Sequence, residues 1–353
     1  MKLSTFTKIL LLTTLTSVVL PLSVYAAPAI SSISGTVTHG SAVTITGSSF
    51  GTKTTAAPSL WDTVDNNYSL SDGASIPTGG SYPWGGQQGT TYDTSDAQRT
   101  SHSTAMYKST DGHVDSHTVS PTGQLYVSWW LKMSANPIPP DGNHSSKFIR
   151  AGNSAHQQDP NVETFSWTQQ QSYIYDGNYL ADDWLNNGQT DWAITPNQWN
   201  FLEVWFDNTA KTYTIKVDGN TKVNASSWAG GNFNFDYVWL IGFDAGGNAP
   251  PTLTLWTDDI YIDNTFSRVM IGDASTYASS THFEMQPPTA WSSSSITVSL
   301  NQGSFADGST AYVYVIDANG NVSAGNPITF GGTFSTSGTS GTNPKPSPPT
   351  LAN

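Results

Sequence analysis

Two glutamates stand among aromatic residues in strand-like segments of the chain. Glu163 opens the segment ETFSW, and Glu203 lies in WNFLEVWFD, residues 199–207. In an alternating strand each shares a face with aromatic residues, Trp167 in the first case and Trp205 in the second. Glycoside hydrolysis needs two carboxylates flanking one bond, so this pair is a candidate acid and base. The alternatives are two acceptors for sugar hydroxyls, or two strand residues paired across a sheet.

The same segments carry aromatic residues suited to binding sugars. A pyranose ring can stack on the flat face of Trp or Tyr, while Arg and other polar groups bond its hydroxyls. The candidate carbohydrate-binding residues are Trp130, Arg150, Trp167, Tyr173, Tyr175 and Trp205. Arg150 has two other interpretations, which are neutralising a uronate in a lyase and pairing with Glu163. At least half of the Trp side chains are expected to fill a core instead.

Two adjacent carboxylates suggest a metal site. Asp258 and Asp259 lie in WTDDIYID, and Asp244 lies in a nearby segment. Carboxylate oxygens are the ligands that Ca²⁺ prefers, so these three are candidate metal ligands, with a purely structural role as the alternative. DANGN, residues 317–321, has the spacing of a calcium loop but lacks its closing Glu, which favours a turn. The sequence requires no cofactor, and a structural Ca²⁺ is a hypothesis.

Charge narrows the class of partner. The chain has 26 acidic residues against 13 Lys and Arg, giving a net charge of -13. Nucleic acids and anionic membranes need basic residues to replace their counterions, so both are excluded as partners. The same balance disfavours strongly anionic polysaccharides and leaves neutral ones. The 13 Trp and 15 Tyr are typical of carbohydrate-binding proteins, and the absence of Cys excludes disulfides.

The first residues resemble an export signal. Lys2 and Lys8 precede an apolar run at residues 9–22, and small residues follow up to Ala26. This pattern predicts a signal peptide over 1–26 and a secreted protein, extracellular or periplasmic. The run is too short for a membrane anchor, so no membrane insertion is expected.

The elements that must position these residues are β-strands. Alternating segments are separated by Gly, Asn, Asp and Pro turns, and no helical period is sustained beyond the first residues. Residues 211–223 predict a hairpin turning at Asp218-Gly219 or Gly219-Asn220. Further strands are predicted at 125–133, 199–207, 237–243 and 253–263.

Three of these segments carry a family resemblance. QWNFLEVWFDNTAKTYTIKVDGN, YVWLIGF and WTDDIYIDN resemble the concanavalin A-like lectin and glucanase jelly roll, including its laminin-G-like forms. The resemblance covers roughly residues 57–268 and implies a jelly-roll sandwich. It implies no single chemistry, because that fold hosts lectins, hydrolases, lyases and structural modules. The Glu-x-Asp-x-x-Glu pattern of its glucanases and the paired motifs of its alginate lyases are absent, which weighs against an enzyme.

A second resemblance involves both ends of the chain. ISGTVTHGSAVTITGSSFG, residues 33–51, is similar to the start of an IPT/TIG immunoglobulin-like domain, and residues 289–330 are similar to its closing strands. We therefore expect one all-β sandwich split by an inserted jelly roll, with tandem domains as the alternative. The predicted parts are 27–56 and 269–332 for the TIG-like sandwich, 57–268 for the jelly roll and 333–353 for a flexible tail.

Three functions are compatible with this organisation. The first is a carbohydrate-binding or surface-adhesion protein that holds a neutral polysaccharide on the concave face of the jelly roll. The second is a polysaccharide-degrading enzyme, a glycoside hydrolase or lyase. The third is a structural component of an extracellular matrix. TIG-like modules act as spacers or interaction modules, which adds protein contacts through that domain to the expected glycan partner.

Overall fold

The computed structural model is nearly all β, which confirms the predicted fold class. Among the described residues, no helix is both long and apolar enough to span a membrane. Only the backbone is described at 110–113, 115, 116, 147, 225, 226, 333 and 334, and in the strands between 164 and 184. The structure describes residues 26–65, 71–95, 99–120, 123–135, 147–152, 164–168, 171–175, 179–184, 194–226, 235–240 and 254–334.

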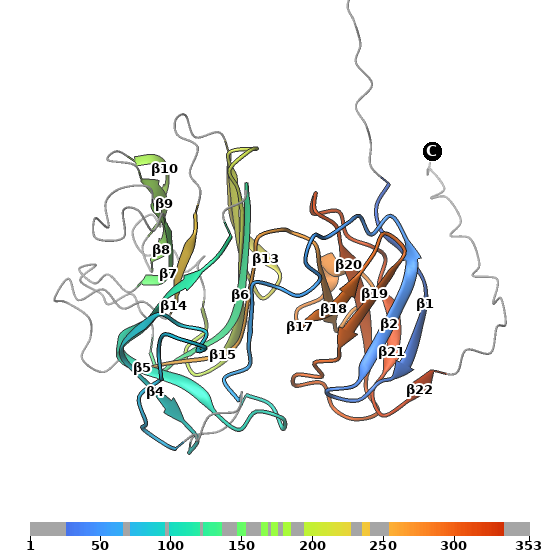
Figure 1. The fold of residues 1–353 in the computed structure, drawn as a ribbon, viewed down its shortest axis with the longest axis horizontal. Helices are drawn as coiled ribbons and strands as arrows, with labels where there is room; N and C mark the ends of the chain where they lie inside the picture. Colours follow the sequence, from blue (N-terminus) through green and yellow to red (C-terminus); the bar gives the residue numbers. More distant parts are fainter. Residues whose placement is uncertain are drawn as a thin grey trace, which may run out of the picture.

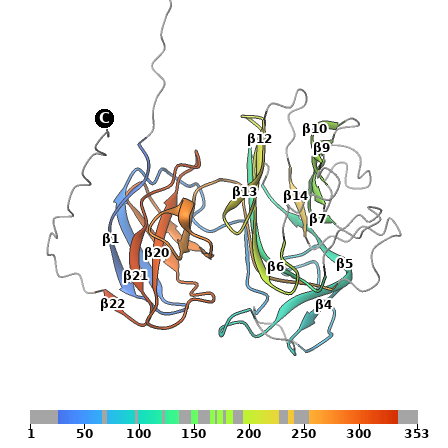
Figure 2. The same cartoon turned by 180° about the vertical axis from the view of Figure 1, so that it is seen from behind.

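Two β-sandwiches lie side by side (Figures 1 and 2). The central sandwich is built from the middle of the chain, and its strands follow the order β10-β9-β8-β7-β14-β5-β15-β6-β11-β12-β13, with β3 and β4 attached to β15 and β5. Its strands are β3 (Leu60–Asp62), β4 (Gly86–Asp93), β5 (Met106–Thr118), β6 (Gln124–Met133), β7 (Lys147–Gly152), β8 (Thr164–Thr168), β9 (Gln171–Tyr175), β10 (Tyr179–Trp184), β11 (Trp199–Asp207), β12 (Thr212–Val217), β13 (Asn220–Ser226), β14 (Tyr237–Leu240) and β15 (Leu255–Asp263).

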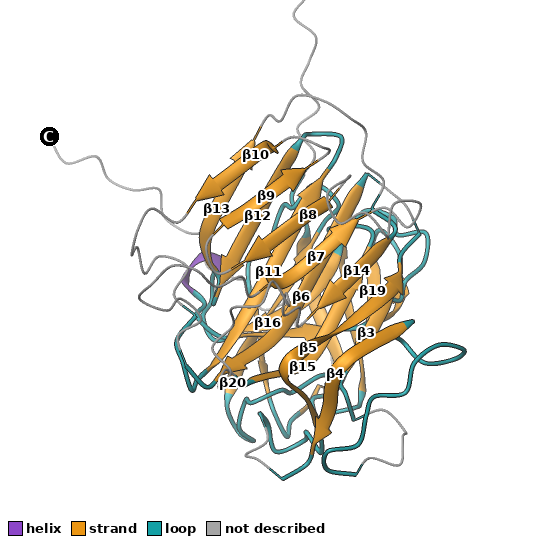
Figure 3. Ribbon diagram, turned by 90° about the vertical axis from the view of Figure 1, so that its left-hand side faces the viewer, coloured by secondary structure: helices purple, strands orange, loops and turns teal. Residues whose placement is uncertain are grey.

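The long strand β5 joins the two layers of the central sandwich. Its first half pairs with β15, and its second half pairs with β14. We call β15-β6-β11-β12-β13 the proximal sheet, because it faces the second sandwich (Figure 1). We call β10-β9-β8-β7-β14 the distal sheet, and its strands are seen face-on in Figure 3.

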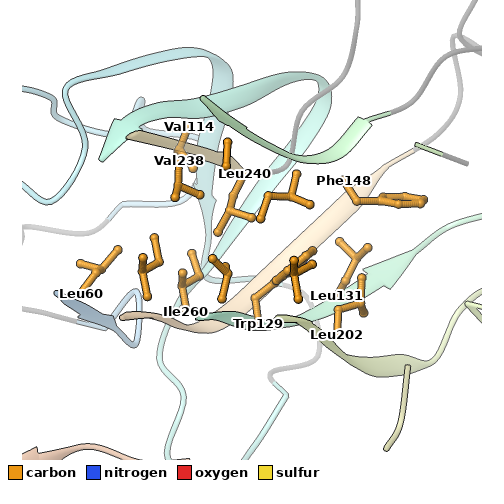
Figure 4. Close-up of a cluster of buried hydrophobic side chains, with 14 of the residues drawn as sticks. Leu60, Val114, Trp129, Leu131, Phe148, Leu202, Val238, Leu240 and Ile260 are labelled. Carbon is orange, nitrogen blue, oxygen red and sulfur yellow. The ribbon is translucent and has the colours of Figure 1, made fainter. Parts of the chain in front are cut away.

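The core between the two layers follows from the alternation in the sequence. On β11, Leu202, Val204 and Phe206 point into this core, as predicted for 199–207. The other layer supplies Val238 and Leu240 from β14 (Figure 4). The predicted hairpin is also confirmed, because Asp218 and Gly219 have φ of 50° and 73° and form the two-residue turn between β12 and β13.

The second sandwich draws its strands from both ends of the chain. One sheet has the order β18-β19-β2-β1-β22 and the other β17-β16-β20-β21. Its own core joins early residues such as Val43 and Ile45 to late ones such as Val298 and Val313. Its elements are β1 (Ala29–Thr36), β2 (Ala42–Ser48), β16 (Arg268–Gly272), the 3-10 turn η2 (Tyr277–Ser279), β17 (Phe283–Gln286), β18 (Pro288–Trp291), β19 (Ser295–Ser299), β20 (Thr310–Ile316), β21 (Asn326–Thr329) and β22 (Thr333–Phe334).

A third apolar cluster joins the two sandwiches. It packs side chains from the outer face of the proximal sheet against side chains of β16, β17 and β20. Its buried members are Tyr126, Trp130, Phe201, Tyr261, Phe266, Met270, Phe283, Met285, Tyr314 and Ile316. Lys53, on the way into the central sandwich, pairs with Asp263, on the way out, at 2.6 Å. Burial of apolar surface therefore holds the sandwiches against each other, and this ion pair ties the two connections.

Candidate functional site

The predicted sugar-binding residues fall on two different sheets. Trp130 and Trp205 lie on the outer face of the proximal sheet, which the second sandwich covers. Trp130 is only 4% exposed and packs against Phe201 and His282. Trp205 contacts Phe266 and lies close to the turn at Gly320. Both rings thus contact protein, which differs from the expected place on an open face.

The candidate catalytic Glu203 is also covered by this contact. Its carboxylate is fully buried, accepts a hydrogen bond from the Tyr126 hydroxyl at 2.8 Å and pairs with Arg268 at 3.4 Å. The Arg268 guanidinium lies 3.9 Å from the Trp205 ring centre and 4.0 Å from that of Tyr126. Glu203 therefore serves as the counter-ion of a buried arginine. Its expected partner Glu163 lies outside the described residues.

The adjacent carboxylates Asp258 and Asp259, which the sequence offers as candidate metal ligands or as structural residues, hold the guanidinium of Arg99. Arg99 donates to Asp258 Oδ2 at 3.2 Å and also to Asp259. The same guanidinium donates to Glu284 of the second sandwich at 2.8 Å, and its carbon lies 4.7 Å from the Trp130 ring centre. Among the described residues, no group of three or more His, Asp or Glu is arranged to hold a metal ion. Asp244 lies outside that part of the chain.

The buried cluster around Arg99 has shifted pKa values. Burial alone would raise the pKa of Glu284, but the charge of Arg99 and the hydrogen bond from His282 outweigh it and lower the pKa to about 2. Burial raises the pKa of Asp259 to about 6, although Arg99 acts against it. Burial and the neighbouring charge of Asp259 also raise the pKa of Asp258 well above its usual range.

Glu284, in the contact between the two sandwiches, makes the free energy of unfolding sensitive to acid. A carboxyl whose pKa falls from 4.5 to about 2 on folding stabilises the fold above about pH 4.5, and this stabilisation is lost as the pH falls towards 2. Over that window we expect Glu284 to account for a loss of up to about 3 kcal/mol in the free energy of unfolding. Urea titrations across the window should show a shallower acid slope for Glu284→Gln. Asp307→Asn, at an exposed carboxylate of the same sandwich, should keep the original slope. Equal slopes for Glu284→Gln and the unaltered chain would contradict the assignment.

The outer face of the distal sheet carries a separate group of aromatic and basic side chains. On β14, Tyr237 and Trp239 alternate with the core residues Val238 and Leu240, so both rings face away from the core. Their ring centres lie 5.6 Å apart. Arg150 pairs in register with Trp239, and its guanidinium carbon lies 5.7 Å from that ring centre. We call Tyr237, Trp239 and Arg150 the distal platform.

Three observations describe the surroundings of the distal platform, which are a close contact, a shifted pKa and a buried donor. The Tyr237 ring lies over Gly152, where a Cβ would overlap its hydroxyl, so the close approach depends on glycine at this position. Burial raises the pKa of Tyr237, and the charge of Arg150 partly offsets this. Arg150 Nε is buried and has no hydrogen-bond partner within the described part of the chain. A buried donor of this kind calls for an acceptor, such as a ligand hydroxyl.

Cross-strand pairing shows how the other predicted residues, Tyr173, Tyr175 and Trp167, lie relative to the distal platform. Arg150 pairs with Ser166, which pairs with Tyr173, so Tyr173 belongs to the cross-strand row of Arg150 and Trp239. Tyr175 belongs to the neighbouring row, through Thr164, Gly152 and Tyr237. Trp167 pairs with Ile149, a residue of the central core, and so belongs to a different row.

The sequence contained a signal for the two platform residues that were missed. In YVWLIGF, Tyr237 and Trp239 alternate with Val238 and Leu240, and this pattern places two rings on one face. The segment is predicted as a strand, but neither ring is among the candidate carbohydrate-binding residues. Its pairing with the strand of Arg150 is a long-range feature that alternation does not reveal.

No protein-family model and no curated protein matches the chain. Among solved structures, it is similar to the binding domain of botulinum neurotoxin serotype D, with 10% identity over 64% of this chain and 66% of that one, and a TM-score of 0.35. It is also similar to the binding domain of Paraclostridial Mosquitocidal Protein 1, with 12% identity over 65% and 70% of the two chains and a TM-score of 0.36.

A third similar structure is domain 4 of a GH43 extracellular arabinanase from Geobacillus stearothermophilus, in complex with arabinotriose. Identity is 14% over 67% of this chain and 93% of that domain, with a TM-score of 0.32. The matched region spans just under two thirds of the first toxin domain, at 66%. At this level of similarity none of the three carries an argument about function, which has to come from the site itself.

Proposed function

We propose that the protein is a secreted carbohydrate-binding protein that holds a neutral polysaccharide on the outer face of the distal sheet. The observation that carries the proposal is the distal platform, where the Trp239 ring centre lies 5.6 Å from that of Tyr237 and 5.7 Å from the guanidinium carbon of Arg150. Trp239 is partly exposed and offers a stacking surface for a sugar ring, and Arg150 offers donors for hydroxyls. Tyr237 is only 4% exposed and packs beside the Trp239 ring. Tyr173 and Tyr175 extend the same rows across β9.

The net charge of the chain, the interior position of the two platform strands and the burial of Glu203 support the same class of ligand. A net charge of -13 repels dense polyanions, whereas sugar hydroxyls carry no charge. The two strands of the platform are interior to the distal sheet, β14 between β5 and β7, and β7 between β8 and β14. Neither offers a free backbone edge to a peptide strand, so the side chains must supply the contacts. The burial of Glu203 beside Arg268 favours binding over hydrolysis.

Replacing Trp239 with Ala should weaken retention on the bound polysaccharide about tenfold, because one stacking surface is lost. The measurement is a panel of neutral polysaccharides, scored for retention of the protein and for release of reducing or unsaturated ends. Arg150→Gln should weaken binding less, because a neutral amide still donates to a hydroxyl.

Tyr82→Ala is the matched control, since Tyr82 is an aromatic residue of the central sandwich that is 38% exposed and lies outside the platform. Thermal unfolding should show that the variants stay folded. Retention unchanged in Trp239→Ala would contradict the proposed site. Release of sugar ends would instead make the protein an enzyme, and no retention on any glycan would favour a structural role.

A further inference from the structure

We propose that a second surface, on the proximal sheet, binds an anionic sugar unit that carries a carboxylate or a sulfate. The surface is a row of five cross-strand neighbours that we call the Lys–Trp row. It lies on the opposite layer from the distal platform and does not share residues with it. Its members are Thr91, Lys108, Trp256, Lys132 and Trp199.

Register places these side chains on one face. Trp256 pairs with Lys108 on one side and Lys132 on the other, and Lys132 also pairs with Trp199. Directly opposed residues of antiparallel strands share a face, so the rings and amines alternate along the row.

The Lys–Trp row lies just beyond the cover of the second sandwich. The next row on the same face contains Asp258, Trp130 and Phe201, and all three are buried in the contact between the sandwiches. Every residue of the Lys–Trp row, in contrast, is partly exposed, although Trp199 also packs against the cluster that joins the sandwiches. A ligand can therefore reach this row while the second sandwich occupies the rest of the face.

The central ring of the row is held in place from several sides. The Trp256 indole N–H donates to Asp93 at 2.9 Å, and Lys108 pairs with the same oxygen at 2.9 Å. Lys132 Nζ lies 4.7 Å from the Trp256 ring centre, and Lys108 Nζ lies 5.7 Å from it. The ring is thus fixed before any ligand arrives, which lowers the entropic cost of binding.

The charge of Lys132 remains available to a ligand. Asp93 neutralises Lys108, whereas no ion pair joins Lys132 to a carboxylate in the described part of the chain. With Lys108 neutralised, Lys132 leaves one positive charge beside the Trp256 ring on a molecule of net charge -13. Such a site suits a single anionic group, because a dense polyanion would meet the repulsion of the whole protein.

The shape of the row favours a saccharide over an acidic peptide. Trp256 and Trp199 lie two strands apart, or about 10 Å, which offers two ring platforms with an amine between them. Strands β15, β6 and β11 are all interior to the sheet, so a peptide finds no backbone edge to pair with. A sugar ring stacked on an indole with its anion at Lys132 uses both features.

The test uses one neutral sugar and two charged versions of it. Binding of lactose, 3′-sialyllactose and lactose 3′-sulfate to the whole protein is measured by calorimetry at low and physiological salt. We expect at least one charged sugar to bind more tightly than lactose, with the difference shrinking as salt is added. The two charged sugars distinguish a carboxylate from a sulfate ligand.

Variants assign this binding to the row. Lys132→Gln should reduce affinity for the charged sugar about fivefold, while Lys222→Gln, the same charge change on β13, should leave it unchanged. Trp199→Ala should reduce it about tenfold, and Trp199→Tyr should restore most of it. Trp239→Ala, which tests the distal platform, should leave it unchanged, so the two proposals fail separately.

Three results would overturn the inference. The first is equal binding of lactose and both charged sugars. The second is an equal loss in Lys132→Gln and Lys222→Gln, which would assign the effect to net charge alone. The third is tighter binding of a triglutamate peptide than of either charged sugar, with the same sensitivity to Lys132→Gln, which would make the row a surface for acidic peptides.

Discussion

Replacing Arg99 with Met should reduce the free energy of unfolding by about 3–5 kcal/mol near pH 8, because it leaves three buried carboxylates without their counter-ion. Arg99 bonds Asp258, Asp259 and Glu284, and its side chain is 2% exposed. The Met side chain keeps the volume of the stem but supplies no charge. The loss should be smaller near pH 5, because carboxyls left without Arg99 can take up protons there.

Urea unfolding followed by Trp fluorescence at both pH values measures this effect. Lys222→Met is the control, since it removes a basic side chain from β13 outside the buried cluster, and it should change stability by less than about 0.5 kcal/mol. A loss below about 1 kcal/mol for Arg99→Met near pH 8 would show that the cluster is not the buried ionic contact that the distances indicate.

Replacing Arg268 with Met should cost about 3 kcal/mol, because the buried charge of Glu203 loses the guanidinium that pairs with it and keeps only its cross-strand neighbour Lys216 nearby. Arg268 is fully buried, donates to the Phe266 carbonyl at 2.9 Å and lies against the rings of Tyr126 and Trp205. The loss combines the ion pair with the attraction between the guanidinium and these rings.

A double variant separates these two contributions. Glu203→Gln in the Arg268→Met background removes the unpaired charge, and the amide still accepts the hydrogen bond from Tyr126. We expect the double variant to recover at least about 1 kcal/mol in urea unfolding. If the double variant loses as much free energy of unfolding as the two single variants lose together, the charge of Glu203 does not depend on Arg268.

The fold was predictable from local pattern, and the faces of its strands were too. The predicted strand at 199–207 is β11, and its two faces separate as alternation required. A resemblance at each end of the chain predicts that both ends share one sandwich, and in the structure β19 pairs with β2. The sandwich runs slightly further than predicted, because β22 at Thr333–Phe334 pairs with β1.

The candidate site was harder to predict, because an aromatic face that binds sugar and one that binds protein have the same sequence pattern. Trp130, Glu203 and Trp205 alternate outward as predicted, and only the placement of the second sandwich shows that they are covered. Local sequence pattern does not predict Arg99 as the partner of Asp258, since the two lie 159 residues apart. Long-range pairing of this kind also produced the distal platform and the Lys–Trp row.

Because the second sandwich is split along the chain, its strands cannot all pair in the order in which they are synthesised. β1 and β2 are made before their partners, because β2 pairs with β19 and β1 with β22, so both strands keep an unpaired edge until β19 and β22 have been made. Unpaired edges of this kind are prone to aggregation.

Folding of the central sandwich reduces the time for which β1 and β2 lack their partner strands. Once folded, it holds Lys53 and Asp263 within 2.6 Å of each other, so 209 intervening residues count as a short closed loop. The β1–β2 hairpin then lies close to Asp263, the point from which the chain continues towards its partner strands β19 and β22. Residues that stabilise the central sandwich should therefore also set how fast the two ends of the chain find each other.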